Sequence, residues 1–414
     1  MRQRLHQRIF LITCILLAFF MPVFPKILPV IIFFMMANWM ASGIYMKTVP
    51  RLFSEKWRVM TLSFALLYLF YLAGMLYSSN HDYGWFDLEV KLSLFIFPVI
   101  FATSDLNVLT GSWRRIISGS FIAGCIAGAL LLLAHTWMVN ERFGVPDAFY
   151  YTNLSWYFHS SYLAMYYTFA TGIALCWLTA DYTGRASMAT AGLLLLILFL
   201  EAMIFLCSSK AGLILLVITQ ALFVVLLIFK KAGLARIVLV SLVMIAVFAG
   251  YSRIFPFAFT RISRADSMVS SAQTVQANPT DGTVARMAIW KVSAGLIRQH
   301  FLFGVGTGDV KDVYLEAYQQ QQLYPVYRKK LNAHNQYFQT FVTLGVFGFS
   351  LMAALLLIPL FRALRKGEYL YVSFLLIFAI NILFESMLES QAGVIFYAFF
   401  NVLFFTGDGN KQQG

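Results

Sequence analysis

The chain has 414 residues, of which 60% are hydrophobic, 17% are aromatic and only 12% are charged, and its mean hydropathy is +0.74. A soluble domain of this length has no core large enough for so much apolar surface, so the composition excludes a soluble protein and indicates a polytopic membrane protein. The formal net charge of +13 is mainly a topology signal. It implies no nucleic-acid partner.

The apolar runs are long enough to cross a hydrocarbon core of about 30 Å as helices, and the alternating pattern of a membrane barrel is missing. We therefore predict an all-α protein with about twelve transmembrane helices. The predicted spans are 9–24, 27–46, 59–77, 88–103, 116–137, 159–180, 187–207, 211–229, 237–253, 334–361, 370–386 and 391–406. No small-residue cleavage site follows the first apolar run, so we interpret that run as a retained anchor.

The basic residues of the short loops predict the orientation in the membrane. With a cytoplasmic N-terminus, most of them fall on one side: Arg2, Arg4, Arg8, Lys47, Arg51, Lys56, Arg58, Arg114, Arg115, Arg185, Lys230, Lys231, Arg236, Arg362, Arg365, Lys366 and Lys411. The short loops opposite receive only Lys26, Lys91, Arg142, Lys210 and Arg253. This asymmetry predicts that both termini are cytoplasmic.

The pattern divides the chain into three parts: residues 1–253 with spans 1–9, an extramembrane segment at 254–333, and residues 334–414 with spans 10–12 and a short cytoplasmic tail. On the predicted topology the segment 254–333 faces outward, which in a bacterial inner membrane means the periplasm. It is the one large extramembrane element of the chain.

The extramembrane segment has its own predicted organisation. Ser263 to Thr283 is polar and contains Asn-Pro and Asp-Gly pairs, which predicts an irregular loop. Apolar residues on one side of Thr283 to Gln299 predict an amphipathic helix at the membrane interface or on top of the bundle. The glycine-rich run from Gly304 to Asp309 ends it, and a second helix is predicted from Asp309 to Gln322. The glycines either form a tight turn or let backbone amides approach a phosphate or sugar.

Four motifs lie in and after this segment. They are Arg286-Met-Ala-Ile-Trp290, Phe303-Gly-Val-Gly-Thr-Gly-Asp309, Ala333-His334-Asn335-Gln336-Tyr337 and Gly345-Val-Phe-Gly348. Their order, on one large outward loop before a late span, resembles the signature of the O-antigen ligase and O-antigen polymerase superfamily. The motif region covers roughly 283–348. The span layout extends the resemblance, more weakly, to the whole chain.

The resemblance implies a GT-C-like membrane glycosyltransferase that needs no metal and no cofactor. Members of the ligase branch transfer a glycan from undecaprenyl pyrophosphate to a sugar hydroxyl of lipid A-core, with inversion, at the periplasmic face of the bacterial inner membrane. The donor, the acceptor and membrane lipids are the implied partners. An O-antigen polymerase or a protein O-oligosaccharyltransferase of the same superfamily is the nearest alternative, and a lipid or polysaccharide transporter is a more distant one.

His334 is the candidate catalytic base. An imidazole is largely neutral near neutral pH and can accept the proton of a hydroxyl that attacks an anomeric carbon. The other interpretation is a histidine at a helix end, at the depth of the lipid headgroups, and the family motif favours the base. Asn335 and Gln336 fit two roles: they orient the imidazole or the acceptor, or they form hydrogen bonds at the start of a span.

Positive charge for the pyrophosphate is expected from Arg286, whose guanidinium offers fixed bidentate donors. Trp290 lies one turn further on and either supports Arg286 or anchors the helix at the interface. Lys210 stands where the family usually has arginine. It either binds a phosphate as a positive charge without the two parallel hydrogen bonds of a guanidinium, or it only extends from a helix end to the membrane surface. Arg261 and Arg264 add basic charge that attracts the donor or contacts headgroups.

Three acidic residues have no assigned role in the sequence. Glu201 lies inside a predicted span, where a carboxylate should be paired or line a polar cavity. It either has a function or pairs with a structural partner such as Lys91 or Lys210. Glu385 and Glu389 flank the hairpin between spans 11 and 12. These two glutamates either border the catalytic cleft or, by default, face solvent.

Overall fold

The computed structural model describes residues 2–104, 111–180, 188–257 and 282–406, and regular structure in these ranges is helical throughout. The helices are α1 (Arg2–Val23), η1 (Pro25–Ile27), α2 (Leu28–Ser42), α3 (Tyr45–Thr48), η2 (Val49–Phe53), α4 (Glu55–Gly74), η3 (Met75–Tyr77), α5 (His81–Lys91), α6 (Ser93–Thr103), α7 (Gly111–Phe143), α8 (Tyr151–Leu154), α9 (Ser160–Ala180), α10 (Met188–Cys207), α11 (Lys210–Phe229), α12 (Leu234–Ile254), α14 (Gly282–Gln299), α15 (Val310–Gln320), α16 (Tyr324–Arg328), α17 (Gln336–Lys366), α18 (Tyr369–Asn381), η6 (Met387–Glu389) and α19 (Gln391–Phe405). Arg261, Arg264 and most of the predicted irregular loop lie outside the described residues.

Eight helices of the described ranges are long and apolar enough to cross a membrane, which makes the chain a multi-pass membrane protein by helix composition. They are Arg2–Val23, Pro25–Ser42, Trp57–Tyr77, Ser112–Phe143, Met188–Cys207, Lys210–Phe229, Leu234–Ile254 and Gln336–Lys366. The other four predicted spans also fall on helices, but α6, α18 and α19 have only 11, 13 and 15 residues, and α9 is not among the eight. The run predicted as one span at 88–103 is divided between α5 and α6 at Leu92. The count of twelve and the outward side of the loop stay predictions.

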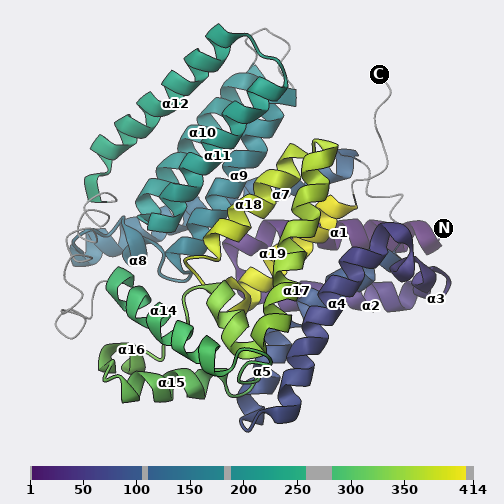
Figure 1. The fold of residues 1–414 in the computed structure, drawn as a ribbon. Coiled ribbons are helices and arrows are strands. Elements are labelled where there is room, and N and C mark those ends of the chain that lie inside the picture. The colour runs from purple at the N-terminus through teal and green to yellow at the C-terminus, as the bar shows by residue number, and fades with distance from the viewer. Residues whose placement is uncertain (1, 105–110, 181–187, 258–281, 407–414) are drawn as a thin grey trace.

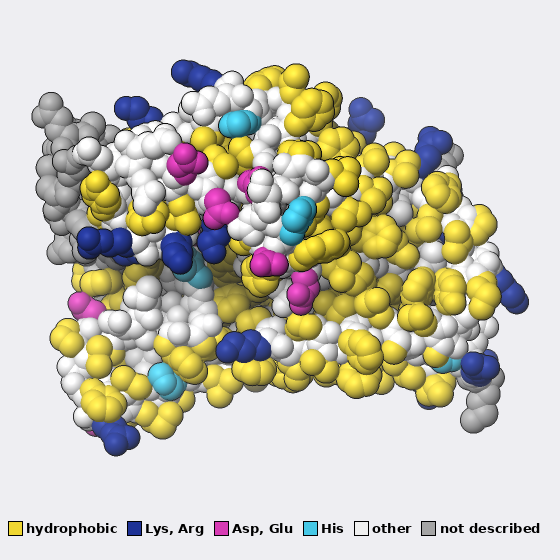
Figure 2. Space-filling view, turned by 90° about the horizontal axis from the view of Figure 1, so that it is seen from below, with side chains coloured by type: hydrophobic (Ala, Val, Ile, Leu, Met, Phe, Trp, Pro, Cys, Tyr) yellow, Lys and Arg dark blue, Asp and Glu magenta, His cyan; other side chains and the backbone are white. Residues whose placement is uncertain are grey.

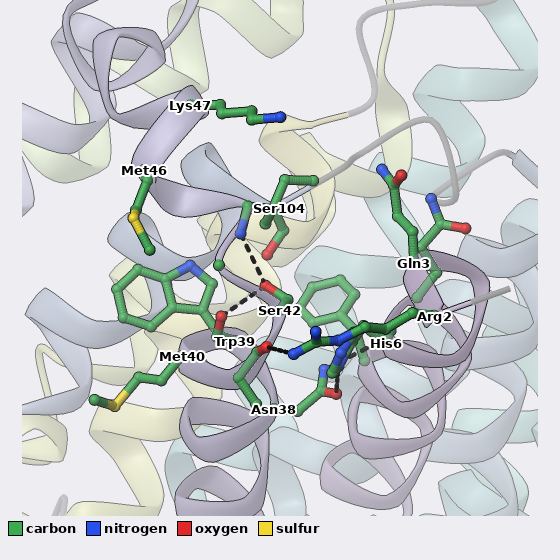
Figure 3. A pocket seen from close by; sticks show the side chains of 15 residues that line it. Arg2, Gln3, His6, Asn38, Trp39, Met40, Ser42, Met46, Lys47 and Ser104 are labelled. Carbon is green, nitrogen blue, oxygen red and sulfur yellow. Dashed lines mark hydrogen bonds between the residues drawn. The ribbon is translucent and has the colours of Figure 1, made fainter.

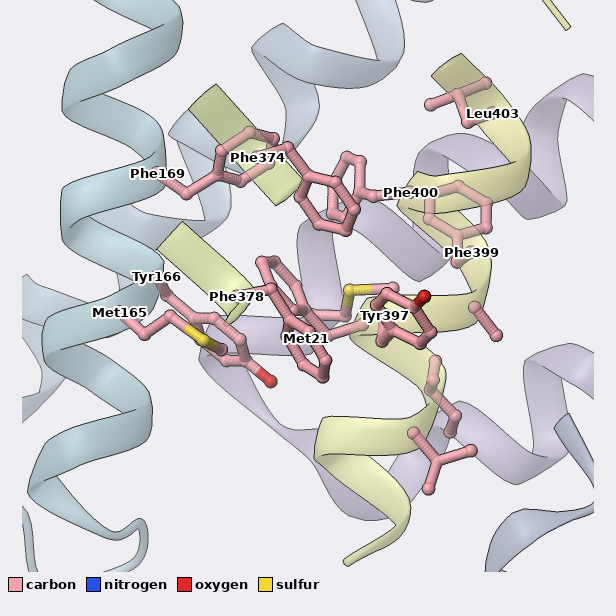
Figure 4. Packing of buried hydrophobic residues seen from close by; sticks show 14 of the residues in the cluster. Met21, Met165, Tyr166, Phe169, Phe374, Phe378, Tyr397, Phe399, Phe400 and Leu403 are labelled. Carbon is pink, nitrogen blue, oxygen red and sulfur yellow. The ribbon is translucent and has the colours of Figure 1, made fainter. Parts of the chain in front are cut away.

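The bundle packs around α19, whose residues are buried continuously from Gly393 to Phe405. A helix that is apolar on every side must be surrounded, and α6 and α18 lie directly against this one. Aromatic rings fill the contact between α19, α18 and α9 (Figure 4). The Phe400 ring lies 5.0 Å from the Phe169 ring and 5.9 Å from the Phe374 ring, centroid to centroid. Such edge-to-face and tilted pairs add to the stability gained from burial.

The opposite case is α12, in which no residue is buried although the helix is strongly apolar. It lies at the margin of the bundle, beside α10 and α11 (Figure 1). In water such a helix would expose its apolar surface at a high free-energy cost. Its composition therefore fits direct contact with lipid.

The predicted amphipathic helices are confirmed as α14 and α15, which differ from the predicted bounds by one or two residues. Together with the short α16 they form a separate layer at one end of the bundle (Figure 1). This layer has a small core of its own, built on Ile289, Val292 and Tyr318. Inside it the Ser293 hydroxyl and the Tyr314 hydroxyl lie 2.9 Å apart, so both buried groups are hydrogen-bonded.

The glycine-rich turn joins this layer to α17 through backbone hydrogen bonds. The amides of Val305 and Gly306 donate to the carbonyls of Val342 and Thr343, at 2.9 and 3.0 Å. The helical path of α17 breaks at the opposing Gly345, which has φ +65° and ψ −163°. The backbones approach so closely here that a side chain at Gly345 would overlap the carbonyl of Leu302. The turn interpretation of the glycines is therefore confirmed, because these amides already have partners.

Asp309 fixes the other side of the layer to the N-terminal half of the chain. Its carboxylate accepts hydrogen bonds from the backbone amides of Ser79 and Asn80, at 2.7 to 2.9 Å. The neighbouring Thr307 hydroxyl donates to the carbonyl of Tyr71 at 2.6 Å. The layer is thus held by α17 on one side and by the end of α4 on the other.

We predict that Gly345→Ala destabilises the protein by about 2 kcal/mol or more, because a β-carbon disfavours a positive φ and meets the Leu302 carbonyl. The apparent melting temperature of the purified full-length protein in detergent should fall. Gly192→Ala on α10, where an added β-carbon meets nothing within 4 Å, is the matched control and should melt at or slightly above the temperature of the wild type. Equal melting of both variants would contradict the packing argument.

Candidate active site

His334 lies in the short segment between the α14–α16 layer and α17. Its backbone is left-handed, with φ +45°, which is unusual for a residue with a side chain and tends to occur at functional sites. The backbone amide donates to Oδ1 of Asn332 at 3.0 Å, which helps to hold this turn. The ring lies with its Nδ1 3.0 Å from Oε2 of Glu385, and 22% of the side-chain surface is exposed. The imidazole is therefore fixed on one side and accessible on the other.

Glu385 is the centre of the site. Its side chain is only 6% exposed, and its other oxygen, Oε1, accepts hydrogen bonds from the Arg286 guanidinium and from the Ser161 hydroxyl, the latter at 3.2 Å. Burial alone would raise the pKa of Glu385, but the His334 hydrogen bond and the positive charge of Arg286 outweigh it and lower this pKa from 4.5 to about 2. Glu385 is thus a carboxylate near neutral pH and holds Arg286 and His334 together.

The default interpretation of Glu385 and Glu389 as solvent-exposed residues is wrong. Both follow an apolar helix in a short hairpin, and residues in such hairpins are usually exposed to solvent. The hairpin folds back under α14 and α17 instead, so Glu385 is buried and the Glu389 side chain is only 9% exposed. A carboxylate directly after an apolar run was the one signal in the sequence, since such a group requires a partner.

His159 also lies at this site, just before α9, and no motif in the sequence points to it. Its burial lowers its pKa, which the Glu385 carboxylate opposes, while the nearby Arg286 and His334 lower it further. Figure 2 views the molecule from the side of the α14–α16 layer. It shows a hollow in this face, with a histidine side chain inside and Lys and Arg side chains along its border.

Trp290, Asn335 and Gln336 support the segment around His334. The Trp290 indole donates to the Ala333 carbonyl at 3.1 Å, so it braces this segment and not Arg286. Asn335 caps the N-terminus of α17, and its side chain accepts from the Phe338 amide at 3.1 Å. Gln336 accepts from the Leu388 amide at 2.7 Å and thereby ties α17 to the hairpin. Asn335 and Gln336 therefore make the hydrogen bonds expected of residues at the start of a span.

A second buried charge network lies beside the first. The Lys91 ammonium is fully buried, contacts the Asp87 carboxylate and lies 3.2 Å from Oε1 of Glu389. It also lies over the Tyr71 ring, 4.7 Å from its centroid. The Gln336 amide donates to the same Glu389 oxygen at 3.2 Å. One hairpin, 382–390, therefore carries a carboxylate into each network.

Lys210 and Glu201 lie apart from each other, and the expected pairing of Glu201 with Lys91 or Lys210 is wrong. The Glu201 carboxylate accepts from the Gln220 amide on α11 at 2.9 Å. The Lys210 ammonium, at the start of α11, donates to the Thr283 hydroxyl at 2.7 Å. Because Thr283 and Arg286 share the first turns of α14, Lys210 reaches the same end of this helix as Arg286.

Another cavity, of about 550 Å³, lies between α1, α2 and α3 (Figure 3). Arg2, His6, Asn38 and Lys47 are among its lining residues, and Nδ1 of His6 lies 2.8 Å from Oδ1 of Asn38. No residue of the Glu385 site lines it. It is therefore separate from the candidate active site.

The helices and the buried charged site define a multi-pass membrane protein with a polar centre at one end of its bundle. Residues 191–353 match the family model described as O-Antigen ligase, so this part of the chain is similar to an O-antigen ligase domain. The match confirms the resemblance inferred from the motifs. It includes Lys210, Arg286 and His334 and ends before Glu385. No curated protein matches the chain.

Glu385 makes a testable contribution to stability. Because its pKa in the folded protein lies below the ordinary 4.5, its charge stabilises the fold above that pH, and this contribution is lost as the pH falls from about 4.5 to about 2. The apparent melting temperature of wild type should therefore fall more steeply between about pH 5 and pH 2 than that of Glu385→Gln.

The matched control is Glu316→Gln, which removes an exposed carboxylate of α15. This variant should keep the wild-type slope. A Glu385→Gln protein with the same slope as wild type would show that Glu385 is not held as a stabilised carboxylate.

Proposed function

We propose that the protein is an O-antigen ligase. It transfers a glycan from undecaprenyl pyrophosphate to a sugar hydroxyl of lipid A-core, at the periplasmic face of the bacterial inner membrane, without a metal ion and with inversion of the anomeric centre. The observation that carries this proposal is the cluster of Arg286, Glu385 and His334. It supplies a proton acceptor and fixed positive charge within one site of a membrane-embedded O-antigen ligase domain.

His334 acts as the general base. An ionised carboxylate accepts hydrogen bonds and cannot donate one, so the contact with Glu385 requires the proton to be on Nδ1 of His334. The lone pair is then on Nε2, which is the atom that takes the proton of the acceptor hydroxyl. Glu385 fixes the ring orientation and stabilises the imidazolium that forms, as the carboxylate of a catalytic triad does.

Arg286 and Lys210 stabilise the departing pyrophosphate. Only one Arg286 nitrogen contacts Glu385, and 24% of the side chain is exposed, so the guanidinium keeps donors for a phosphate. Lys210 contacts the first turn of α14, where the helix dipole also favours an anion. This combination supports a site for two phosphates that needs no divalent ion. Arg261 and Arg264 belong to the same proposal as additional sources of positive charge.

The reaction is a single displacement. The acceptor oxygen forms a bond to the anomeric carbon while the bond from this carbon to the phosphate oxygen breaks, and that electron pair leaves with the pyrophosphate. The hydroxyl proton moves to Nε2 of His334. Attack from the face opposite the leaving group inverts the anomeric centre. Electrostatic stabilisation of the leaving group contributes most where water is excluded.

We predict that His334→Ala lowers the rate of glycan transfer by about 10² to 10⁴, the usual contribution of a general base. The rate is measured with purified protein, lipid-linked glycan and lipid A-core. His300→Ala, at the exposed end of α14, is the control and should transfer at the wild-type rate. A His334→Ala enzyme with wild-type activity would exclude the base role.

Arg286→Lys should raise the KM for the lipid-linked donor about tenfold or more, because lysine keeps the charge and loses the planar set of donors. The KM for the acceptor should change much less. A change confined to the acceptor KM would contradict pyrophosphate binding by Arg286. Lys210→Arg should preserve donor use, since arginine is the residue that the superfamily usually carries at this position.

The whole proposal is tested by deleting the gene and analysing lipopolysaccharide together with the lipid-linked glycan. Loss of glycan-capped lipopolysaccharide, with long chains retained on the undecaprenyl carrier, supports a ligase, provided that wild type restores the cap and His334→Ala does not. Core with a single repeat unit would instead identify a polymerase. Unchanged lipopolysaccharide with loss of glycan from proteins would identify a protein O-oligosaccharyltransferase, and normal glycan transfer by the His334 and Arg286 variants would favour a transporter.

A further inference from the structure

His159, at the start of α9, is a residue of the site that the proposed function does not use. Its carbonyl accepts a backbone hydrogen bond from Leu163 at 3.3 Å, so His159 caps this helix. The ring contributes to the cap, since Nδ1 accepts from the Ser161 amide at 3.4 Å. A backbone amide can only donate, so Nδ1 carries the lone pair and the proton of the neutral ring is on Nε2.

The first turn of α9 lies between the elements that carry the charged groups of the site. The Ser161 hydroxyl donates to Oε1 of Glu385 at 3.2 Å, the same oxygen that the Arg286 guanidinium contacts. The Ser209 hydroxyl, next to Lys210 in the chain, donates to the Ser161 hydroxyl at 3.4 Å. The start of α9 therefore joins the Glu385 hairpin to the turn from which Lys210 begins α11.

This junction places the His159 ring beside the charged groups of the site. The ring interacts electrostatically with Arg286, Glu385 and His334. Although the surrounding atoms lower its pKa, the residue is exposed, so it lies in the wall of the site and not in its interior. The described residues offer no acceptor to its Nε2–H, so a bound ligand can take this hydrogen bond.

A neutral donor suits a place next to an arginine that binds an anion. A further positive charge beside Arg286 would be unfavourable before the ligand binds. An N–H group of a neutral imidazole gives a phosphate oxygen one more hydrogen bond without this repulsion. The positive end of the α9 dipole lies at the same residue and also favours an anion there.

We propose that the Nε2–H of His159 donates a hydrogen bond to a phosphate oxygen of the leaving undecaprenyl pyrophosphate. This inference rests on the proposed function and adds one donor to its pyrophosphate site. The hydrogen bond strengthens as the bond between the anomeric carbon and the phosphate oxygen breaks, because negative charge then grows on the pyrophosphate. His159 therefore affects kcat more than the KM for the donor.

Two variants separate this role from helix capping. Asparagine is a good helix cap, but its side chain is too short to place a donor where Nε2 lies. His159→Asn should therefore melt like the wild type and lower kcat about tenfold to a hundredfold. Glutamine places its amide nitrogen near the position of Nε2, so His159→Gln should keep a kcat close to that of the wild type.

His300→Asn, the same change at the exposed end of α14, is the matched control and should leave both kcat and melting unchanged. A fully active His159→Asn would show that His159 only caps α9. Equal loss of kcat in His159→Asn and His159→Gln would show that the reaction does not depend on a donor at this position. Either result would overturn the inference.

Binding of undecaprenyl pyrophosphate alone, followed by native mass spectrometry of the full-length protein, tests His159 without glycan transfer. His159→Asn should raise the Kd about tenfold, whereas His159→Gln and His300→Asn should not. Equal Kd values in wild type and His159→Asn would overturn only the role of His159. A wild-type protein that does not bind undecaprenyl pyrophosphate would instead overturn the proposed donor, and the role of His159 with it.

Discussion

The geometry of the candidate site depends on one buried carboxylate. A charge as buried as Glu385 is tolerated only when it is paired and hydrogen-bonded, and its two oxygens satisfy this requirement with Arg286 on one side and His334 on the other. The arginine comes from α14, the histidine from the turn before α17 and the carboxylate from the hairpin after α18. The free energy of pairing therefore holds three distant segments in one arrangement.

The surrounding scaffold restricts each of these segments separately. Backbone hydrogen bonds join the glycine-rich turn to the break in α17, and Asp309 fixes the same layer to the residues after α4. The hairpin is held in turn by Gln336, which bonds the Leu388 amide, and by the contact of Glu389 with Lys91. Precise placement of catalytic groups requires such support, because a small displacement of a base or a charge reduces catalysis strongly.

Much of the helical layout and two of the three central site residues could be predicted from the sequence. Long apolar runs mark helices reliably, and the motifs around Arg286 and His334 are continuous in the sequence. Glu385 was named only as a residue that borders the cleft or, by default, faces solvent, because its pairing with Arg286 and His334 depends on a fold-back that no local pattern encodes. The partners of Lys91 and Glu201 were missed for the same reason, since a buried charge shows that it needs a partner and not which one. The lengths of the predicted spans were also less accurate than their positions, because α6, α18 and α19 have only 11, 13 and 15 residues.

The O-antigen ligase match ends at residue 353, inside α17, whereas the carboxylate that completes the site follows α18. The matched region therefore does not contain all the residues of the candidate site. A chimera joined at its boundary would bring Arg286 and His334 next to a foreign hairpin and leave a cation without its counter-charge. The loop with Arg286 and His334 and the C-terminal hairpin with Glu385 therefore form one structural unit, and an exchange of segments that keeps this pairing has to move both together.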